Sequence, residues 1–151
     1  MSKNVEDQDF IRLVAAELIE DPHSADVLSA AAQVISEGAG AFLFKALKDQ
    51  VGLHAQDYEL VRRVMSLLEA AMDVEPCVAG YLMARLYPLA GQEYAHDVYN
   101  GIELWMHNSD SMALADALNA LSEESVRPML RRSYREWAEV IRRRALKKST
   151  E

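Results

Sequence analysis

The sequence predicts an all-α protein built from about eight short helices. Helix-forming residues dominate the chain, above all alanine, leucine, glutamate and arginine. Aromatic residues make up only 7%, and isoleucine and threonine are also scarce, which disfavours a sheet protein. Apolar residues recur at spacings of three and four along most of the chain, the signature of helices with one buried face. Connections of two to six residues predict antiparallel helical hairpins.

The chain is expected to form one domain. At 151 residues it can bury a core without the help of a metal or a disulfide. We expect a polar tail at 1–6, a single all-α domain at 7–148 and a tail at 149–151. A HEAT-like repeat is the alternative to a compact bundle, because 28–37 resembles 114–123 at twice a repeat period of ~43 residues. We favour the bundle, since alanine-rich helices resemble one another by chance.

Four helices are predicted in the first half of the chain, at about 7–20, 25–36, 41–51 and 55–72. Asp21 and Pro22 end the first of these, because the residue before a proline avoids the helical conformation. Ser24 is a suitable N-cap for the second. Gly52 suits the left-handed position after the third.

Four more helices are predicted in the second half, at about 76–87, 91–107, 110–121 and 126–148. Pro76 suits the first turn of the fifth helix, and Pro88 is expected to end it. In the sixth helix the inward stripe is expected to contain Val98, Ile102 and Trp105.

The closing helix is long and amphipathic, with two distinct faces. Its apolar seam recurs at spacings of 4, 3, 4 and 4 and consists of Leu130, Tyr134, Trp137, Ile141 and Ala145. The other side carries an arginine face formed by Arg131, Arg132, Arg135, Arg142 and Arg143. We expect the seam to dock on the rest of the protein and the arginines to face water.

Charge is distributed unevenly. Residues 1–126 carry 21 acids and 7 bases, a balance of −14, whereas residues 127–151 carry 3 acids and 9 bases, a balance of +6. The total is −8. An acidic body favours encounters with basic partners and opposes non-specific binding to nucleic acid.

Catalytic and metal-binding patterns are missing from the sequence. Cys77 is the sole cysteine, which excludes an internal disulfide and a cysteine-rich metal site, and Asp73 and Glu75 oppose a thiolate there. Glu93 and His96 have the spacing of a di-iron motif, but such a bundle needs a second Glu-x-x-His on another helix, and no other predicted helix contains one. There is no nucleophile elbow and no phosphate loop. We therefore expect no enzyme activity, no metal and no cofactor.

The N-terminal residues do not form a signal pattern, and no apolar run approaches the ~20 residues of a membrane span. The cytoplasm is therefore the expected compartment, and no membrane partner is expected.

The leading functional hypothesis is a non-enzymatic protein-binding module. A small acidic helical domain could cover a basic surface of a partner protein, as inhibitors, immunity proteins and adaptors do. The candidate partner-binding face combines acids with aromatic anchors on and after the sixth helix, namely Glu93, Tyr94, Asp97, Tyr99, Glu103 and Asp110.

The alternative is a small helical subunit of a nucleic-acid-associated complex, with the arginine face on phosphates. The same face could instead join two copies into a homo-oligomer. It could also be a solvated surface, in which the last cations offset the helix macrodipole.

Overall fold

The protein is all-α, as predicted. The structure is a computed structural model that describes residues 2–52, 58–90 and 96–150, with side chains from residue 8 onward. Within these residues the secondary structure consists of α1 (Ser2–Glu20), α2 (Ala25–Ser36), α3 (Gly40–Val51), α4 (Tyr58–Ala71), α5 (Pro76–Ala90), α6 (His96–His107), α7 (Met112–Glu124) and α8 (Pro128–Thr150). The predicted helix starts at 55 and 91 lie outside the described residues.

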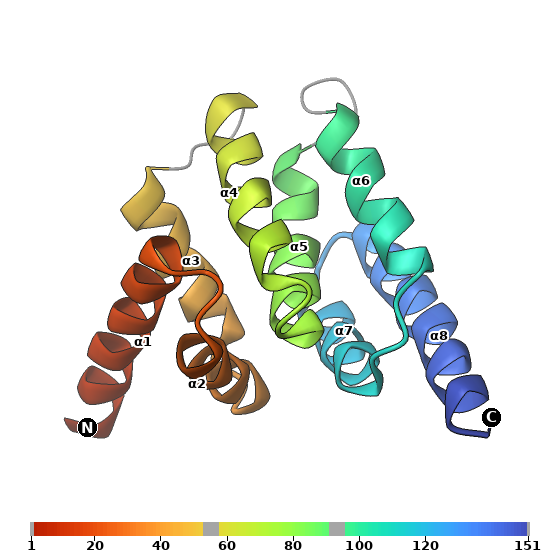
Figure 1. The fold of residues 1–151 in the computed structure, drawn as a ribbon, viewed down its shortest axis with the longest axis horizontal. Helices are drawn as coiled ribbons and strands as arrows, with labels where there is room; N and C mark the ends of the chain where they lie inside the picture. Colours follow the sequence, from red (N-terminus) through yellow and green to blue (C-terminus); the bar gives the residue numbers. More distant parts are fainter. Residues whose placement is uncertain (1, 53–57, 91–95, 151) are drawn as a thin grey trace.

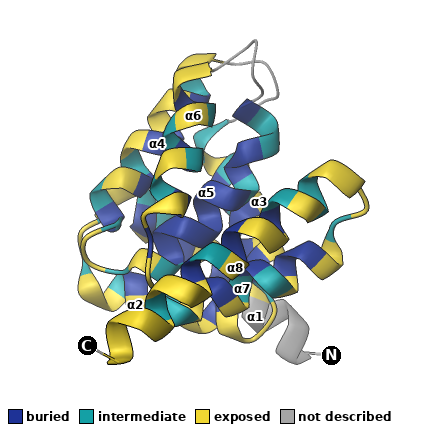
Figure 2. Ribbon diagram, turned by 90° about the vertical axis from the view of Figure 1, so that its right-hand side faces the viewer, coloured by how far each residue is buried: buried dark blue, intermediate teal, exposed yellow. Residues whose placement is uncertain are grey.

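Helix α5 is the centre of the fold. It packs against α2, α4, α6 and α7, while α1 and α3 pack on each other at one end and α7 and α8 at the other (Figure 1). Ten of its 15 residues are buried, so it is surrounded on nearly every side. The buried positions continue into the neighbouring helices as one apolar core (Figure 2).

Helices α2 and α7 contain the two similar segments, 28–37 and 114–123. Both helices pack against α5. Leu28 and Leu114 occupy matching places in the two segments, and both are fully buried.

The long helix α8 docks through its seam, as its spacing predicts. Tyr134, Trp137 and Ile141 are buried, and α8 lies along α7 and touches α6. Leu130 and Ala145 are only partly buried, because they lie toward the two ends of a helix that is much longer than α7. The seam therefore anchors the middle of α8.

Pro88 does not end α5, contrary to the sequence prediction. The helix continues through Pro88 to Ala90. A proline lacks the N–H that would bond the carbonyl four residues earlier, here that of Ala84. The Tyr134 hydroxyl donates a 2.8 Å hydrogen bond to this carbonyl instead. A side chain 46 residues further along the chain thus satisfies the acceptor that Pro88 leaves open.

The ends of the chain also differ from the prediction. Helix α1 begins at Ser2 and α8 extends to Thr150, so 2–6 and 149–150 are helical rather than tails. These segments contain neither proline nor glycine, so nothing local stops the helices.

The spacing of apolar residues in the sequence predicts an inward stripe of Phe10, Leu13, Val14 and Leu18 on α1, and only the last two are buried. Phe10 and Leu13 are 50% and 55% exposed, and the buried positions are Ile11, Val14, Ala15 and Leu18. As the first helix, α1 packs against α2 and α3 along one face.

Within the described residues, no helix combines the length and apolarity needed to cross a membrane.

Candidate functional site

The acids predicted to form a partner-binding face on α6 are not presented as one free surface. Asp97 forms an ion pair with Arg62 of α4. The Asp110 carboxylate lies 3.1 Å from the Lys148 ammonium of α8. Glu93 and Tyr94 lie outside the described residues. The charges of Asp97 and Asp110 therefore already have partners within the chain.

Glu103 was predicted to belong to the exposed partner-binding face, but its half-buried carboxylate bonds to the neighbouring helices. It accepts a 2.5 Å hydrogen bond from the Tyr87 hydroxyl and a 3.3 Å bond from the indole N–H of Trp137. Burial and then the bond to Glu103 raise the pKa of Tyr87. The spacing of residues along α6 did not reveal these bonds, because α6 lies against both α5 and α8 and so has two inward sides.

The aromatic residues of α6 join the same contact. The Tyr99 ring stacks on Tyr87 with centroids 4.2 Å apart, and Tyr87 meets Trp137 edge-on at 4.8 Å. Tyr99 is thus half-buried and is not the exposed anchor that the sequence predicted. The stacked rings of Tyr87, Tyr99 and Trp137 hold α5, α6 and α8 together. Trp105, predicted to face inward, is only partly buried.

The arginine face of α8 is mostly engaged within the chain. Arg132 and Arg143 pair with Glu136 and Glu139 one turn away, and Arg142 pairs with Asp116 of α7 at 2.9 Å. Arg131 donates to the Ser125 carbonyl at 2.9 Å. Among the described residues, only Arg135 of these five has no such partner. The structure does not bring the five arginines together as one uncommitted cationic surface.

An open groove lies between α2 and α7, over the start of α5. Figure 1 shows the two helices on either side of that end of α5. The groove encloses about 560 Å³, a size typical of binding sites. Its lining residues are Ala32, Gln33, Ile35, Ser36, Glu75, Cys77, Ala113, Asp116, Ala117 and Ala120.

Alanines make this groove open. Ala32 comes from α2, and Ala113, Ala117 and Ala120 come from α7. Most large apolar side chains of α2 and α7 point toward the core, and four of the ten lining residues are alanines. Gln33 and Ile35 are the larger side chains on the α2 wall, so a helix that lies in the groove could approach the α7 wall most closely.

The groove carries negative charge. Glu75 lies just before α5 and Asp116 on the wall of α7. Asp116 is partly neutralised by Arg142, whereas Glu75 has no ion-pair partner among the described residues. Asp73 precedes Glu75 by two residues, and Glu37 directly follows the groove residue Ser36.

Cys77 lies half-buried in this groove. Burial raises the pKa of its thiol to about 11, and the carboxylates of Glu75 and Asp116 act in the same direction. The thiol is therefore protonated at neutral pH and is a poor nucleophile. The sequence predicted opposition from Glu75, but the contribution of Asp116 depends on the fold.

The described residues contain no group of three or more histidine, cysteine, aspartate or glutamate side chains placed to hold a metal ion. The ring nitrogen Nε2 of His96 lies 3.0 Å from the amide nitrogen of Asn100, so a local partner occupies it.

Comparisons with protein-family models, with curated proteins and with solved structures found no match.

Sequence reasoning did not find the α2–α7 groove. The signal was present as the alanine content of two similar segments, 28–37 and 114–123. Their common packing on α5 is a tertiary fact, and no periodicity within either helix reveals it.

Proposed function

We propose that the protein is a non-enzymatic, cytoplasmic protein-binding module that docks a basic amphipathic helix of another protein in the α2–α7 groove. Inhibitors, immunity proteins and adaptors act in this manner, by covering a working surface of a partner. The open groove carries the proposal, because it has apolar walls and a Glu75 carboxylate for which the described residues provide no ion-pair partner. A free cysteine in this groove suits a reducing compartment.

The shape of the groove favours a helix as the occupant. Helices α2 and α7 have 12 and 13 residues, so a walled groove between them is at most ~20 Å long. About three helical turns fit that length. Alanine walls permit close approach of such a helix, in the mode by which amphipathic helices bind grooves.

The charge of the groove favours a basic occupant. Lysines or arginines beside the apolar face of the helix would meet Glu75 and Asp116, with Asp73 and Glu37 close to them in the sequence. The net charge of −8 would also speed the encounter with a basic partner.

A second copy of this chain is a poorer occupant. Its basic amphipathic helix is α8, but the apolar residues Tyr134, Trp137 and Ile141 of that helix are buried within their own fold. Undocking them would expose a large part of the core. The occupant we propose is therefore a helix of a different protein.

The nucleic-acid alternative has less support. Arg132, Arg142 and Arg143 are engaged with carboxylates, so phosphate contacts would have to compete with existing ion pairs.

A synthetic peptide of about 12 residues, matched to three helical turns, tests the proposal. It carries leucines at helical spacing on one face and lysines elsewhere, and a scrambled peptide of the same composition is the control. We expect binding with a Kd on the order of 10 μM by calorimetry. The affinity should fall several-fold between about 50 and 500 mM salt. If the scrambled peptide binds equally well, the affinity depends on the charge of the peptide and not on its apolar face. That result would contradict the proposal that a helix docks in the groove.

A further inference from the structure

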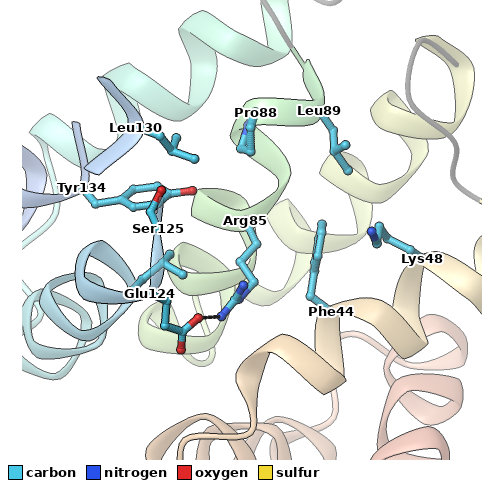
Figure 3. A pocket seen from close by; sticks show the side chains of 10 residues that line it. Phe44, Lys48, Arg85, Pro88, Leu89, Glu124, Ser125, Leu130 and Tyr134 are labelled. Carbon is cyan, nitrogen blue, oxygen red and sulfur yellow. Dashed lines mark hydrogen bonds and ion pairs between the residues drawn. The ribbon is translucent and has the colours of Figure 1, made fainter. Parts of the chain in front are cut away.

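A second concave site lies at the opposite end of α5. It is a pocket of about 300 Å³ formed by α3, the end of α5 and the junction of α7 with α8 (Figure 3). Its apolar walls are Phe44, Leu89, Leu121 and Leu130. The pocket shares no residue with the α2–α7 groove.

A fixed arginine lies in this pocket. The side chain of Arg85 is only 16% exposed. Its Nε donates to the Tyr81 hydroxyl at 2.8 Å, and one Nη donates to the Glu124 carboxylate at 2.5 Å. The Tyr81 ring also lies against the guanidinium, 5.2 Å from its centroid. Because a guanidinium has five donor hydrogens, these bonds hold it in place and leave others for a ligand.

Lys48 adds a second positive charge. Its ammonium lies 5.6 Å from the Phe44 ring centroid and has no carboxylate partner among the described residues. In Figure 3 the Phe44 ring stands between Lys48 and Arg85. Glu124 offsets Arg85, so the charged lining residues leave an excess of one positive charge in a protein of net charge −8.

The neutral polar groups of the pocket differ in how free they are to bind a ligand. The Tyr134 hydroxyl donates its hydrogen to the Ala84 carbonyl, whereas the Ser125 hydroxyl has no hydrogen-bond partner among the described residues. Lys48 and Arg85 are the charged donors that would select an anionic ligand, and the Ser125 hydroxyl is an additional neutral donor.

We propose that this pocket binds a small carboxylic acid with an apolar chain. The carboxylate lies at the positively charged lining, where Arg85 can donate hydrogen bonds and Lys48, on the other side of the Phe44 ring, adds attraction over a longer distance, and the chain lies against Leu89 and Leu130. The volume equals that of about ten water molecules at ~30 Å³ each, which sets the ligand at about ten non-hydrogen atoms. This proposal does not depend on the function proposed for the α2–α7 groove.

Octanoate is a probe of suitable size, and octylamine has a matched chain with the opposite charge. In an NMR titration of the full chain, we expect octanoate to shift the resonances of Phe44, Leu89 and Tyr134 with a Kd on the order of 1 mM. Octylamine should bind there at least about tenfold more weakly. Equal binding of the two would overturn the proposal, as would octanoate shifts located elsewhere.

Two variants on α3 test whether the recognition is local. Lys48→Glu should weaken octanoate binding by at least about tenfold, because the carboxylate then meets a like charge. Lys45→Glu makes the same charge change on an exposed side chain outside the pocket, and we expect less than about a twofold effect. Similar losses of octanoate affinity in both variants would show that binding depends only on the overall charge of the protein, and this result would overturn the proposed pocket site. Circular dichroism checks that both variants fold.

Discussion

The two ends of α5 carry opposite chemistry. At its start, the α2–α7 groove is open, walled by alanines and negatively charged through Glu75 and Asp116. At its end, the pocket around Arg85 is smaller, with leucine and phenylalanine walls and an excess of positive charge. The same central helix thus separates a surface suited to a basic helix from a pocket suited to a small anion.

The difference shows that net charge describes this protein poorly. A charge of −8 predicts attraction to basic partners everywhere, but several acids of α6, α7 and the turn between them have partners within the chain, among them Asp97, Asp110 and Asp116. In the groove, Glu75 has no ion-pair partner in the described part of the chain, and it lies beside apolar walls.

The largest effect is expected from filling the groove. Ala113→Arg places a long cationic side chain on its wall, which should weaken binding of the amphipathic peptide by about 100-fold or more through steric overlap and like charge. Calorimetry measures the change. Ala41→Arg is the control, because Ala41 is exposed on α3 and lies outside the groove. A loss of the same size in Ala41→Arg would place the docking site elsewhere.

The reactivity of Cys77 should also differ strongly from that of a free thiol. Its pKa of about 11, raised from 9.0, lowers the thiolate fraction ~100-fold near neutral pH. Alkylation by iodoacetamide should therefore be slow at pH 8 and should accelerate about tenfold per pH unit until the pH nears 11. Because its carboxylate raises this pKa, Glu75→Gln should speed the reaction at pH 8. A rate equal to that of free cysteine at pH 8 would contradict the environment described for the groove.

Tyr134→Phe tests the other end of α5. The variant removes the hydroxyl that bonds the Ala84 carbonyl opposite Pro88, and the position is 2% exposed. Leaving this buried acceptor without a donor should lower the free energy of unfolding by about 1–3 kcal/mol, measured by urea denaturation. Tyr58→Phe is the matched control, because Tyr58 is 41% exposed, and it should change stability by less than about 0.5 kcal/mol.

The smallest effects are expected on the arginine face of α8. Arg142→Ala breaks the exposed pair with Asp116 and should cost about 0.2–1 kcal/mol of stability. Arg135→Ala removes an arginine that has no partner among the described residues, so it should be close to neutral. Thermal denaturation at low and high salt distinguishes the two, because only the first loss should shrink as salt rises. Equal losses would show that the ion pair has no stabilising role.

The sequence predicted the features that depend only on residues within one helix and its caps. The spacing of Tyr134, Trp137 and Ile141 predicted the seam of α8, and Ser24 was correctly placed as the N-cap of α2, where it accepts from the Val27 N–H. Both features depend only on neighbours within a few turns, so local periodicity and capping rules are sufficient to find them.

Features that depend on distant neighbours were not predicted. Glu103 was placed on the partner-binding face, but its carboxylate accepts hydrogen bonds from Tyr87 and Trp137 of two other helices. Pro88 was expected to stop α5, but Tyr134 supplies the missing donor to the Ala84 carbonyl. The α2–α7 groove belongs to the same class, since two segments far apart in the chain form its walls.

Protection of Cys77 by the amphipathic peptide tests the central proposal most directly. The thiol lines the groove, so an occupant helix would cover it. At pH 9, saturating amphipathic peptide should slow alkylation of Cys77 by about tenfold or more, and the scrambled peptide should leave the rate unchanged. If the amphipathic peptide binds at full affinity while Cys77 reacts at its free rate, the α2–α7 groove is not the docking site.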